Sequence, residues 1–582
     1  MKARAGPFDC FRQVTKGLFG LRSSKTHDKP TIDSVDGVTK QTSCESSTVA
    51  ESNSNSASLA DSVMAPLNLG DAPTKVGRVP RIGKFRRLLS VFGRANPKAA
   101  GGSSQITIKK PQHGSQHDTE NQDDEDNYSD DGEPNQHGED DRRHFKAIRA
   151  ITRKSLEDLV LKLVYPGEDL NPRTCHVTSR TEGSFNHAVM LRIELGSELE
   201  QEYVLKIPAH GTPETWKDED AFMLRNEAVL VKHIRHHTAC PVPEIVAFDE
   251  TLDNPINAPY ILMKKVPGKP ATDLWETSHT NADDPPLALE EKRIRFLTSL
   301  AKAMSHLSEL RFSKIGIPVF VNPEDAEPTS FGPSWSWHSK CLMKELTPIG
   351  PFSRSADFFR AGLDDAWDPE TIIEDAELAA DSPNIPITHG VRQVLDMTLV
   401  ALAPPFYFMN EEDAQEDGKH FVLRHDDLDV QNIMTDDEGN VTGIIDWDGC
   451  MAVPRCIGYT SLPTFLCRDC LPDYTMADRP HLTWSIDRYR GIYSDAMVAA
   501  CEREDGKSTD AIFTKKSAMY QALLAVLYED ADARELLGKL LAEIGDFRRV
   551  APKDLFSHLG SGWPAAAKVL AVKMKELLAP EE

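Results

Sequence analysis

The chain has 582 residues, an apolar fraction of 40% and a formal net charge of −25. Basic and acidic residues are equal in number over residues 1–144, so the whole excess of negative charge falls on residues 145–582. Such a surface argues against nucleic acid as a partner, because phosphate binding needs basic patches. No apolar run is long enough to predict a transmembrane segment.

Residues 1–143 are predicted to form a disordered arm. Residues 41–70 are rich in Ser, Asn and Ala, and residues 118–141 are acidic and polar, so neither stretch buries enough apolar surface to offset the entropy of ordering. Residues 75–98 form a basic segment with eight basic residues and no acidic one. Two interpretations of it stay open: peripheral contact with an anionic membrane or an acidic partner, or a solvated segment paired loosely with the acidic run.

The compartment is predicted from the cysteines and from the start of the chain. Ten cysteines are scattered along it, which is typical of a reducing compartment and makes the cytoplasm the default. Cys467 and Cys470 form a single CxxC pair, which we interpret as buried thiols rather than a zinc or redox site. The first 25 residues are basic, with Asp9 as the one acidic residue, so mitochondria are the alternative.

Residues 144–268 are predicted to form a lobe with an antiparallel sheet and a helix. A helix is expected from Ser155, with Ser155 and Asp158 in a capping-box-like start. Strand patterns, interrupted by one charged helical pattern at 221–237, cover residues 176–183, 185–195, 202–208, 243–250 and 260–266. Strands on both sides of one helix predict an α+β lobe.

Residues 269–582 are predicted to be mainly helical, with short β pieces around residues 421–446. One of these pieces carries the strongest motif of the chain. His425, Asp427 and Asn432 are followed by Asp446, which comes directly after an apolar strand. The turn at residues 437–440 predicts a hairpin between Asn432 and Asp446.

This spacing is typical of phosphoryl transfer, in which the protein positions groups and neutralises charge. Asp427 is placed to meet an attacking hydroxyl, and Asn432 offers a neutral oxygen ligand for a metal ion. Asp446 offers a carboxylate to hold Mg²⁺ against phosphates. The alternative is that Asp427 and Asn432 cap a turn and that Asp446 ends an edge strand.

A cation for the phosphates is expected at Lys206, on a strand with apolar neighbours. Glu227 follows 21 residues later inside an amphipathic helix and is the first choice for its ion-pair partner. Glu219 and Glu202 are the other candidates.

Two further segments are placed to bind a nucleotide. Gly183 and Ser184 join two predicted strands, where backbone N–H groups can approach phosphate oxygens. Met263, Lys264 and Val266 end the strand lobe, where the backbone can offer hydrogen bonds to adenine. An ordinary strand-to-loop exit is the alternative for this second segment.

Together these residues resemble the aminoglycoside phosphotransferase and choline-kinase branch of the protein-kinase-like fold, in particular a large fungal set of such domains. The matching positions are Gly183, Lys206, Glu227, residues 261–268, residues 425–432 and residues 445–449. Asp446-Trp447 stands where a protein kinase has Asp-Phe-Gly. The sequence departs from the family at Asp426, where a small residue is usual, and in having only one glycine in the phosphate turn.

The resemblance implies a two-lobed fold, with ATP and Mg²⁺ in the cleft and transfer of the γ-phosphoryl group to a hydroxyl of a small molecule. It implies that Asp427 is the catalytic base and that Asn432 and Asp446 are metal ligands. It also implies that Lys206 is the phosphate clamp and Glu227 its partner. The acidic charge favours an amine-bearing substrate. Residues 310–360 and 459–475 are expected to contribute to its pocket.

Four aromatic residues are candidates to line that pocket, although a place in the helical core is the alternative for each; they are Trp335, Trp337, Tyr459 and Phe465.

Two other functions stay open. The chain can be a catalytically inactive, kinase-like interaction module tethered by the arm. It can also be a protein kinase, but Asp429 stands where protein kinases have lysine and no Ala-Pro-Glu element follows Asp446.

Overall fold

The computed structural model describes residues 142–167, 172–196, 198–277, 287–335, 348–367, 384–402, 420–470, 482, 485–502, 509–528 and 532–580. These residues all belong to one compact unit. The predicted arm up to residue 141, with its basic segment 75–98 and its acidic segment 118–141, lies outside the described residues.

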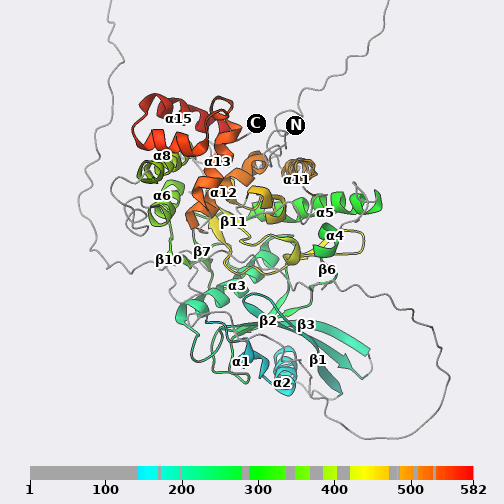
Figure 1. Cartoon of the computed structure of the whole chain (residues 1–582). Coiled ribbons are helices and arrows are strands. Elements are labelled where there is room, and N and C mark those ends of the chain that lie inside the picture. The colour runs from blue at the N-terminus through cyan, green and yellow to red at the C-terminus, as the bar shows by residue number, and fades with distance from the viewer. Residues whose placement is uncertain are drawn as a thin grey trace, which may run out of the picture. The chain divides into compact units, whose positions relative to one another are not determined.

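The first lobe is built on a five-stranded antiparallel sheet with the order β1-β2-β3-β5-β4 (Figure 1). Its elements are α1 (Phe145–Arg149), α2 (Arg153–Val164), β1 (Arg173–Glu182), β2 (Asn186–Leu195), β3 (Glu198–Pro208), α3 (Asp218–His237), β4 (Ile245–Asp249) and β5 (Tyr260–Lys264). Alternate residues of β2 are buried, as expected for a strand with one covered face. The predicted order of strands, one helix and strands is confirmed.

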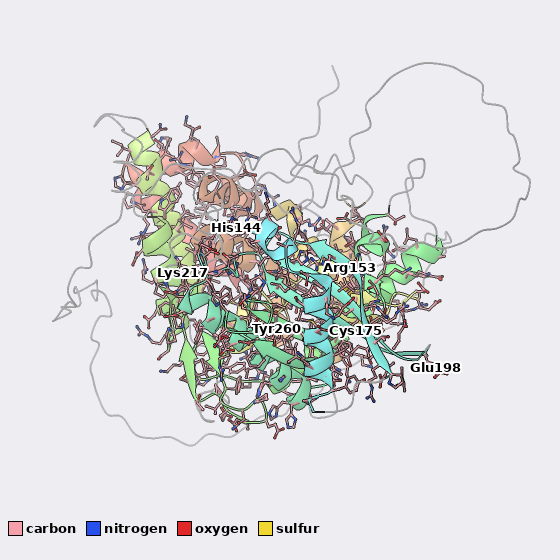
Figure 2. The ribbon with its side chains drawn as sticks, turned by 90° about the horizontal axis from the view of Figure 1, so that it is seen from below. His144, Arg153, Cys175, Glu198, Lys217 and Tyr260 are labelled. Carbon is pink, nitrogen blue, oxygen red and sulfur yellow. The ribbon has the colours of Figure 1, made fainter. Side chains whose placement is uncertain are left out.

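Helix α2 covers one face of this sheet (Figure 2). Its buried residues Leu156 and Val160 belong to the same apolar cluster as Val189 and Leu205 of the sheet. The predicted helix start at Ser155 is wrong: α2 begins at Arg153, and the Oγ1 of Thr152 caps it by accepting a hydrogen bond from the Ser155 backbone N at 3.1 Å. Thr152 lies three residues before Ser155 and is also a good cap, and the capping-box pattern selected the wrong hydroxyl.

Helix α3 belongs to a different core. Its buried residues Leu224, Ala228 and Ile234 pack in the large apolar cluster that continues through the helical lobe to residues such as Phe296. The helix that carries Glu227 is therefore fixed by packing against the second lobe as well as by the sheet.

The second lobe is mainly helical, which confirms the predicted α+β class. Its α-helices are α4 (Thr272–Glu276), α5 (Leu287–Ser305), α6 (Ser355–Ala366), α8 (Asn384–Leu402), α11 (Ile486–Cys501), α12 (Ser517–Tyr528), α13 (Ala533–Glu543), α14 (Pro552–Gly560) and α15 (Pro564–Leu578). Its 3₁₀ helices are η2 (His306–Glu309), η3 (Val430–Asn432), η4 (Arg455–Ile457), η5 (Thr464–Leu466), η6 (Arg468–Cys470), η8 (Thr509–Lys516) and η9 (Gly545–Phe547). None of the described helices has the length and apolar character needed to cross a bilayer.

Short strands in this lobe carry the predicted motif. They are β6 (Lys269–Pro270), β7 (Ile317–Val319), β8 (Ser330–Gly332), β9 (Ser334–Trp335), β10 (Pro348–Ile349), β11 (Val422–Arg424), β12 (Ile433–Thr435), β13 (Val441–Ile444) and β14 (Met451–Val453). β12 and β13 form the predicted hairpin, and β6 adds to it through the pairing of Pro270 with Met434. Gly268 (φ +99°) precedes β6, and a Cβ there would collide with the carbonyl of Thr435. The linker from the first lobe is therefore packed directly on the hairpin.

The backbones of helices α8 and α14 approach each other closely. A Cβ on Gly390 would collide with the carbonyl of Phe556, and a Cβ on Gly560 would collide with the carbonyl of Pro386. The two helices can pack at this separation only because both positions lack a side chain.

We expect Gly390→Ala to lower the free energy of unfolding by about 1–3 kcal/mol, because the helices must separate to admit the methyl group. Gly491→Ala is the matched control, since Gly491 lies in α11 with nothing within 4 Å of its added Cβ. That variant should be neutral or more stable by about 0.5–1 kcal/mol. Chemical denaturation of both proteins makes the comparison, and equal changes would refute this account of the α8–α14 contact.

Candidate active site

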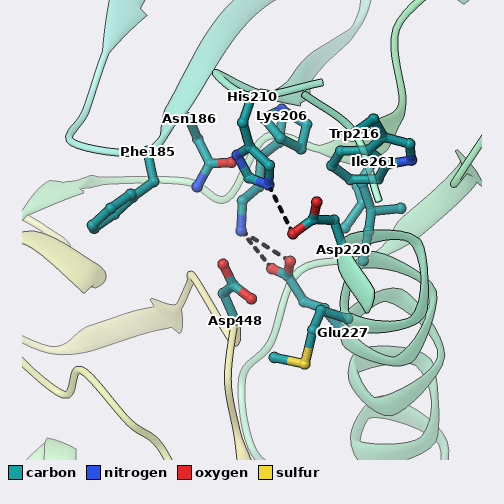
Figure 3. Close-up of a pocket in the computed structure, with 12 residues that line it drawn as sticks. Phe185, Asn186, Lys206, His210, Trp216, Asp220, Glu227, Ile261 and Asp448 are labelled. Atoms are coloured by element: carbon teal, nitrogen blue, oxygen red, sulfur yellow. Dashed lines mark hydrogen bonds and ion pairs between the residues drawn. The ribbon is translucent and has the colours of Figure 1, made fainter. Parts of the chain in front are cut away.

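The ammonium group of Lys206 joins three separate segments of the chain. Its Nζ donates to Glu227 Oε1 at 2.7 Å and to Oε2 at 3.0 Å, and to Asp446 Oδ1 at 2.7 Å. Lys206 lies on β3, Glu227 on α3, and Asp446 just after β13. Figure 3 shows Lys206 and Glu227 facing each other, with Asp448 beside them. The structure thus pairs Lys206 with the carboxylate that the sequence ranked first.

Negative charge exceeds positive charge around this ammonium. Burial opposes the charge of Lys206, but Asp446 and Glu227 outweigh it and raise the Lys206 pKa well above its usual value. Burial raises the pKa of Glu227. The pKa of Asp448 is also raised, first by loss of hydration and then by the negative charge of Asp446. The Lys206 ammonium contacts two carboxylates and lies within electrostatic range of a third, that of Asp448, an arrangement that a further cation would stabilise.

Asp446 has a strained backbone. Its φ of +62° lies in the left-handed region, which costs a non-glycine residue about 1–3 kcal/mol. Contacts on both sides hold it: the Ile445 N donates to the Asn432 carbonyl at 2.9 Å, and the buried Trp447 ring donates from Nε1 to the Ile444 carbonyl at 2.9 Å. These anchors aim the carboxylate at Lys206, although 40% of that side chain is exposed.

Asp427 and Asn432 are in direct contact. The Asn432 Nδ2 donates to Asp427 Oδ2 at 3.0 Å and to the Asp427 carbonyl at 2.9 Å, while Gln431 Nε2 donates to the same Oδ2 at 3.1 Å. Part of the Asp427 side chain is exposed to solvent. The pKa of its carboxyl is nevertheless raised to about 6, first because the nearby protein reduces its hydration and then because Asp429 and Asp426 are negatively charged. A carboxylate that ionises near pH 6 is suited to accept a proton at neutral pH.

The pair formed by Asp427 and Asn432 is tied to Asp446 through the backbone. His425 is buried, and its Nε2 lies 3.1 Å from the carbonyl of Ile445, directly before Asp446. The His425 ring packs edge-on against the Trp447 ring, with the ring centroids 4.7 Å apart. The two halves of the motif therefore form one structural unit.

Arg468 supports the same loop, and the sequence analysis did not identify it. Asp429 caps η3 by accepting from the Val430 N at 2.8 Å, and its other oxygen accepts from Arg468 Nη2 at 2.6 Å. Arg468 also reaches Glu276 at 3.4 Å. Asp429 carried a signal, because an aspartate replaces the lysine of protein kinases there, but nothing in the sequence pointed to its partner.

The predicted phosphate turn lies between β1 and β2. The Gly183 N donates to the Asn186 carbonyl at 2.9 Å, and the Ser184 carbonyl accepts from Arg143 Nη1 at 2.9 Å. A Cβ on Gly183 would meet only the Asn186 carbonyl, at 3.8 Å. The turn itself therefore does not require glycine. Asn186 lines the same pocket as Lys206 (Figure 3).

The predicted adenine-binding residues lie beside Lys206 in the sheet. Met263 pairs with Val204 of β3, two positions along from the pairing of Lys206 with Ile261. The Lys264 ammonium pairs with the Glu244 carboxylate at 2.8 Å, and the Lys264 backbone N donates to the Glu244 carbonyl at 2.9 Å. Val266 packs directly on β13, because a Cβ at Gly443 would collide with it.

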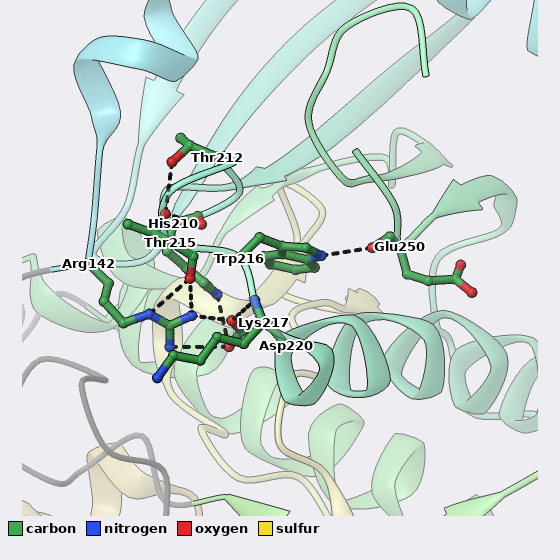
Figure 4. A network of polar contacts seen from close by, with 8 residues as sticks. All are labelled: Arg142, His210, Thr212, Thr215, Trp216, Lys217, Asp220 and Glu250. Atoms are coloured by element: carbon green, nitrogen blue, oxygen red, sulfur yellow. Dashed lines mark hydrogen bonds and ion pairs between the residues drawn. The ribbon is translucent and has the colours of Figure 1, made fainter. Parts of the chain in front are cut away.

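Arg142 anchors the start of α3, the helix that also carries Glu227 (Figure 4). The guanidinium is buried against the carboxylate of Asp220, and its Nε donates to the Thr215 carbonyl at 3.1 Å. Asp220 also accepts from the Lys217 N at 3.0 Å. Arg142, two residues before the expected boundary at residue 144, thus contacts the first lobe.

Two of the aromatic candidates for a substrate pocket belong to the core. Tyr459 is 1% exposed and donates to Asp510 Oδ2 at 2.7 Å. Phe465 packs on Trp275 with ring centroids 4.7 Å apart. Trp335 is half-buried in β9, and Trp337 lies outside the described residues. Cys467 is a buried free thiol, whereas the side chain of Cys470 is not described.

Residues 190–458 match the sequence profile described as "Phosphotransferase enzyme family". The match includes Lys206, Glu227, Asp427, Asn432 and Asp446. This stretch is similar to members of that family and makes up less than half of the chain. The resemblance to aminoglycoside phosphotransferases and choline kinases that the sequence predicted is confirmed at the level of the family.

Individual relatives are distant. A subtelomeric hrmA-associated cluster protein of Aspergillus fumigatus is 31% identical over 101 residues, which are 17% of this chain and 18% of that protein. The altered inheritance of mitochondria protein 9 of Vanderwaltozyma polyspora is 24% identical over 311 residues, 47% of this chain and 46% of that protein. The chain therefore matches less than half the length of either relative.

Among solved structures, one similar chain is a thermostable mutant of aminoglycoside phosphotransferase APH(4)-Ia, in a ternary complex with AMP-PNP and hygromycin B. It is 17% identical, has a TM-score of 0.29, and the alignment covers 64% of this chain and 98% of that one.

We expect Arg468→Ala to destabilise the protein by about 1–3 kcal/mol, because it leaves the Asp429 carboxylate, 10% exposed, without its charged partner. Arg468→Lys should recover part of the loss. Arg295→Ala is the control. It removes an exposed ion pair between α5 and Glu438 of the β12–β13 hairpin, and it should cost less than about 0.5 kcal/mol. Chemical denaturation measures all three, and an Arg468→Ala protein as stable as the control would show that Arg468 does not support the loop.

Proposed function

We propose that this protein transfers the γ-phosphoryl group of ATP, in the presence of Mg²⁺, to a hydroxyl group of a small molecule. The observation that carries the proposal is the contact of Lys206 with both Glu227 and Asp446. His425 of the loop that holds Asp427 contacts the residue before Asp446, so the loop belongs to the same site. The lysine and the carboxylates are the charged groups that phosphoryl transfer needs, and they come from segments as far as 240 residues apart.

In this proposal Asp427 is the catalytic base. Both side-chain amides that contact its carboxylate, from Gln431 and Asn432, donate to Oδ2. They orient the group and leave Oδ1 to accept the proton of an acceptor hydroxyl. The raised pKa of about 6 gives Asp427 more affinity for that proton than an ordinary aspartate has.

Asn432 and Asp446 would hold Mg²⁺. The Asn432 amide directs its N–H groups at Asp427, so its Oδ1 is the atom left for a cation. Among the described residues no group of three or more His, Cys, Asp and Glu is arranged to hold a metal ion. Two oxygen ligands still fit, because Mg²⁺ in kinase sites binds one or two protein groups together with substrate phosphates. When bound, the ion neutralises charge on the phosphates.

Lys206 would contact the phosphates, with Glu227 keeping its ammonium in place. The turn at Gly183 and Ser184 would cover the phosphates, and the backbone from Met263 through Lys264 to Val266 would meet adenine. Asp446 shares the Lys206 ammonium in this structure, so a nucleotide with its cation would have to compete for that contact.

The acceptor that we propose is a hydroxyl compound that also carries an amine. Asp426 and Asp429 flank Asp427, and their charges are close enough to raise its pKa. A cationic amine would be attracted to this face of the loop. The compartment that we propose is the cytoplasm, with mitochondria as the alternative that the basic start of the chain suggests; fractionation of cells expressing the full chain would decide between them.

The proposal predicts acceptor-dependent ATP turnover by the full-length protein with Mg²⁺, across a panel of amino-alcohols, aminoglycosides and sugars. Asp427→Asn should lower the turnover rate about 10²–10⁴-fold, because it removes the base and keeps the shape. Asp437→Asn, in the exposed hairpin turn, is the control and should keep full activity. Nucleotide binding without turnover by any acceptor would favour the inactive interaction module, and phosphorylation of protein alone would favour a protein kinase.

The pH dependence is a separate prediction. Asp427 must be ionised to accept a proton, so kcat/KM should fall as the pH drops through about 6 and level off above it. Asp426→Asn removes one of the negative charges that raise the Asp427 pKa, so it should move this acidic limb to lower pH. A limb that stays in place in that variant would mean that a different group controls it.

A further inference from the structure

A small cavity lies beside the catalytic loop, between that loop and residues of the helical lobe. Its walls include Arg424, His425, Leu428, Ser461 and Gln521. Its volume of about 10 Å³ is room for about one water molecule.

Three buried polar atoms of the residues that line this cavity have no hydrogen-bond partner among the residues that the structure describes. They are Arg424 Nε, His425 Nδ1 and Ser461 Oγ. The three residues are 9%, 4% and 6% exposed, respectively. A buried polar group left unpaired costs about 1–3 kcal/mol, so three on residues that line one cavity suggest a shared partner.

The protons on these atoms are fixed by their other contacts. His425 Nε2 faces the Ile445 carbonyl at 3.1 Å, so Nε2 carries the proton and Nδ1 is an acceptor. Burial lowers the His425 pKa, which keeps the ring neutral. Arg424 Nε can only donate, and its Nη1 already donates to the Ile457 carbonyl at 3.1 Å. The serine hydroxyl can do either.

We propose that this cavity is a binding site for one structural water molecule. The water accepts a hydrogen bond from Arg424 Nε, donates one to His425 Nδ1 and exchanges one with Ser461 Oγ. This arrangement satisfies all three atoms within the two donors and two acceptors that water offers.

An anion does not fit this set of groups. His425 Nδ1 offers a lone pair, which would repel it. The charge of Arg424 is also partly balanced by Asp426, whose Oδ1 lies 3.9 Å from Nε, too far for a hydrogen bond. A neutral molecule that both donates and accepts is required, and the volume limits it to water.

The site has a consequence for the proposed metal ligand. The water holds one nitrogen of His425 while the other holds the carbonyl that precedes Asp446, whose backbone is strained. Ser461 and Arg424 thus act as positioning residues for Asp446 through the water and His425. This second step rests on the proposed function, whereas the water site does not.

A crystal structure of the full-length protein at about 2 Å resolution tests the site directly. We expect one solvent peak about 2.7–3.2 Å from Arg424 Nε, His425 Nδ1 and Ser461 Oγ. The proposal is overturned if the cavity holds no density, or if Ser461 Oγ instead bonds directly to His425 Nδ1. This test needs no enzymatic activity, so it stands even if the proposed function fails.

The positioning role is tested by the Mg²⁺ dependence of turnover. Ser461→Val places methyl groups in the cavity and should expel the water, while Ser461→Ala removes one partner and leaves room for it. We expect the Mg²⁺ concentration for half-maximal rate to rise about tenfold in Ser461→Val and less in Ser461→Ala. Ser494→Ala, a buried serine of α11 outside the cavity, is the control and should not change it. Equal Mg²⁺ dependence in all three variants would refute the positioning role.

Discussion

The ion pairs of Lys206 are the interaction on which the candidate site depends. One ammonium bonds to a carboxylate of α3 and to a carboxylate beyond β13, and so fixes the sheet, the helix and the motif hairpin relative to one another. Each partner is positioned independently: α3 by the large apolar core and Asp446 by the backbone contacts on both sides of it. A strand lysine meets both carboxylates only when all of these elements are packed.

The same region stores unfavourable energy. Asp446 has a left-handed backbone, Glu227 and Asp448 have raised pKa values, and Asp427 resists ionisation beside other aspartates. A protein with no use for this cluster could remove the repulsion with a single neutral substitution. Local strain and excess charge, held by a rigid surrounding, are common at sites that bind a cation or a charged substrate.

Much of the site could be predicted because its chemistry is local in the sequence. Asp427 and Asn432 contact each other across five residues of one loop, and the spacing of a loop is visible in the sequence. Glu227 could be ranked above Glu219 and Glu202 because amphipathic periodicity shows which residues of a helix face inward. Arg468 could not be found in this way, because its contact with Asp429 crosses 39 residues and follows from packing rather than periodicity.

The sequence by itself determined the α+β class, the order of strands and helices, and the identity of the charged residues in the motif. These follow from periodicity and from short-range spacing, which the chain carries whatever its tertiary contacts are. Only the tertiary structure decided that Lys206 binds Asp446, that Tyr459 belongs to the core, and that Arg424, His425 and Ser461 line one cavity. The physical reason is that a hydrogen bond depends on distance and direction within a few tenths of an ångström, and those are set by the packing of the whole domain.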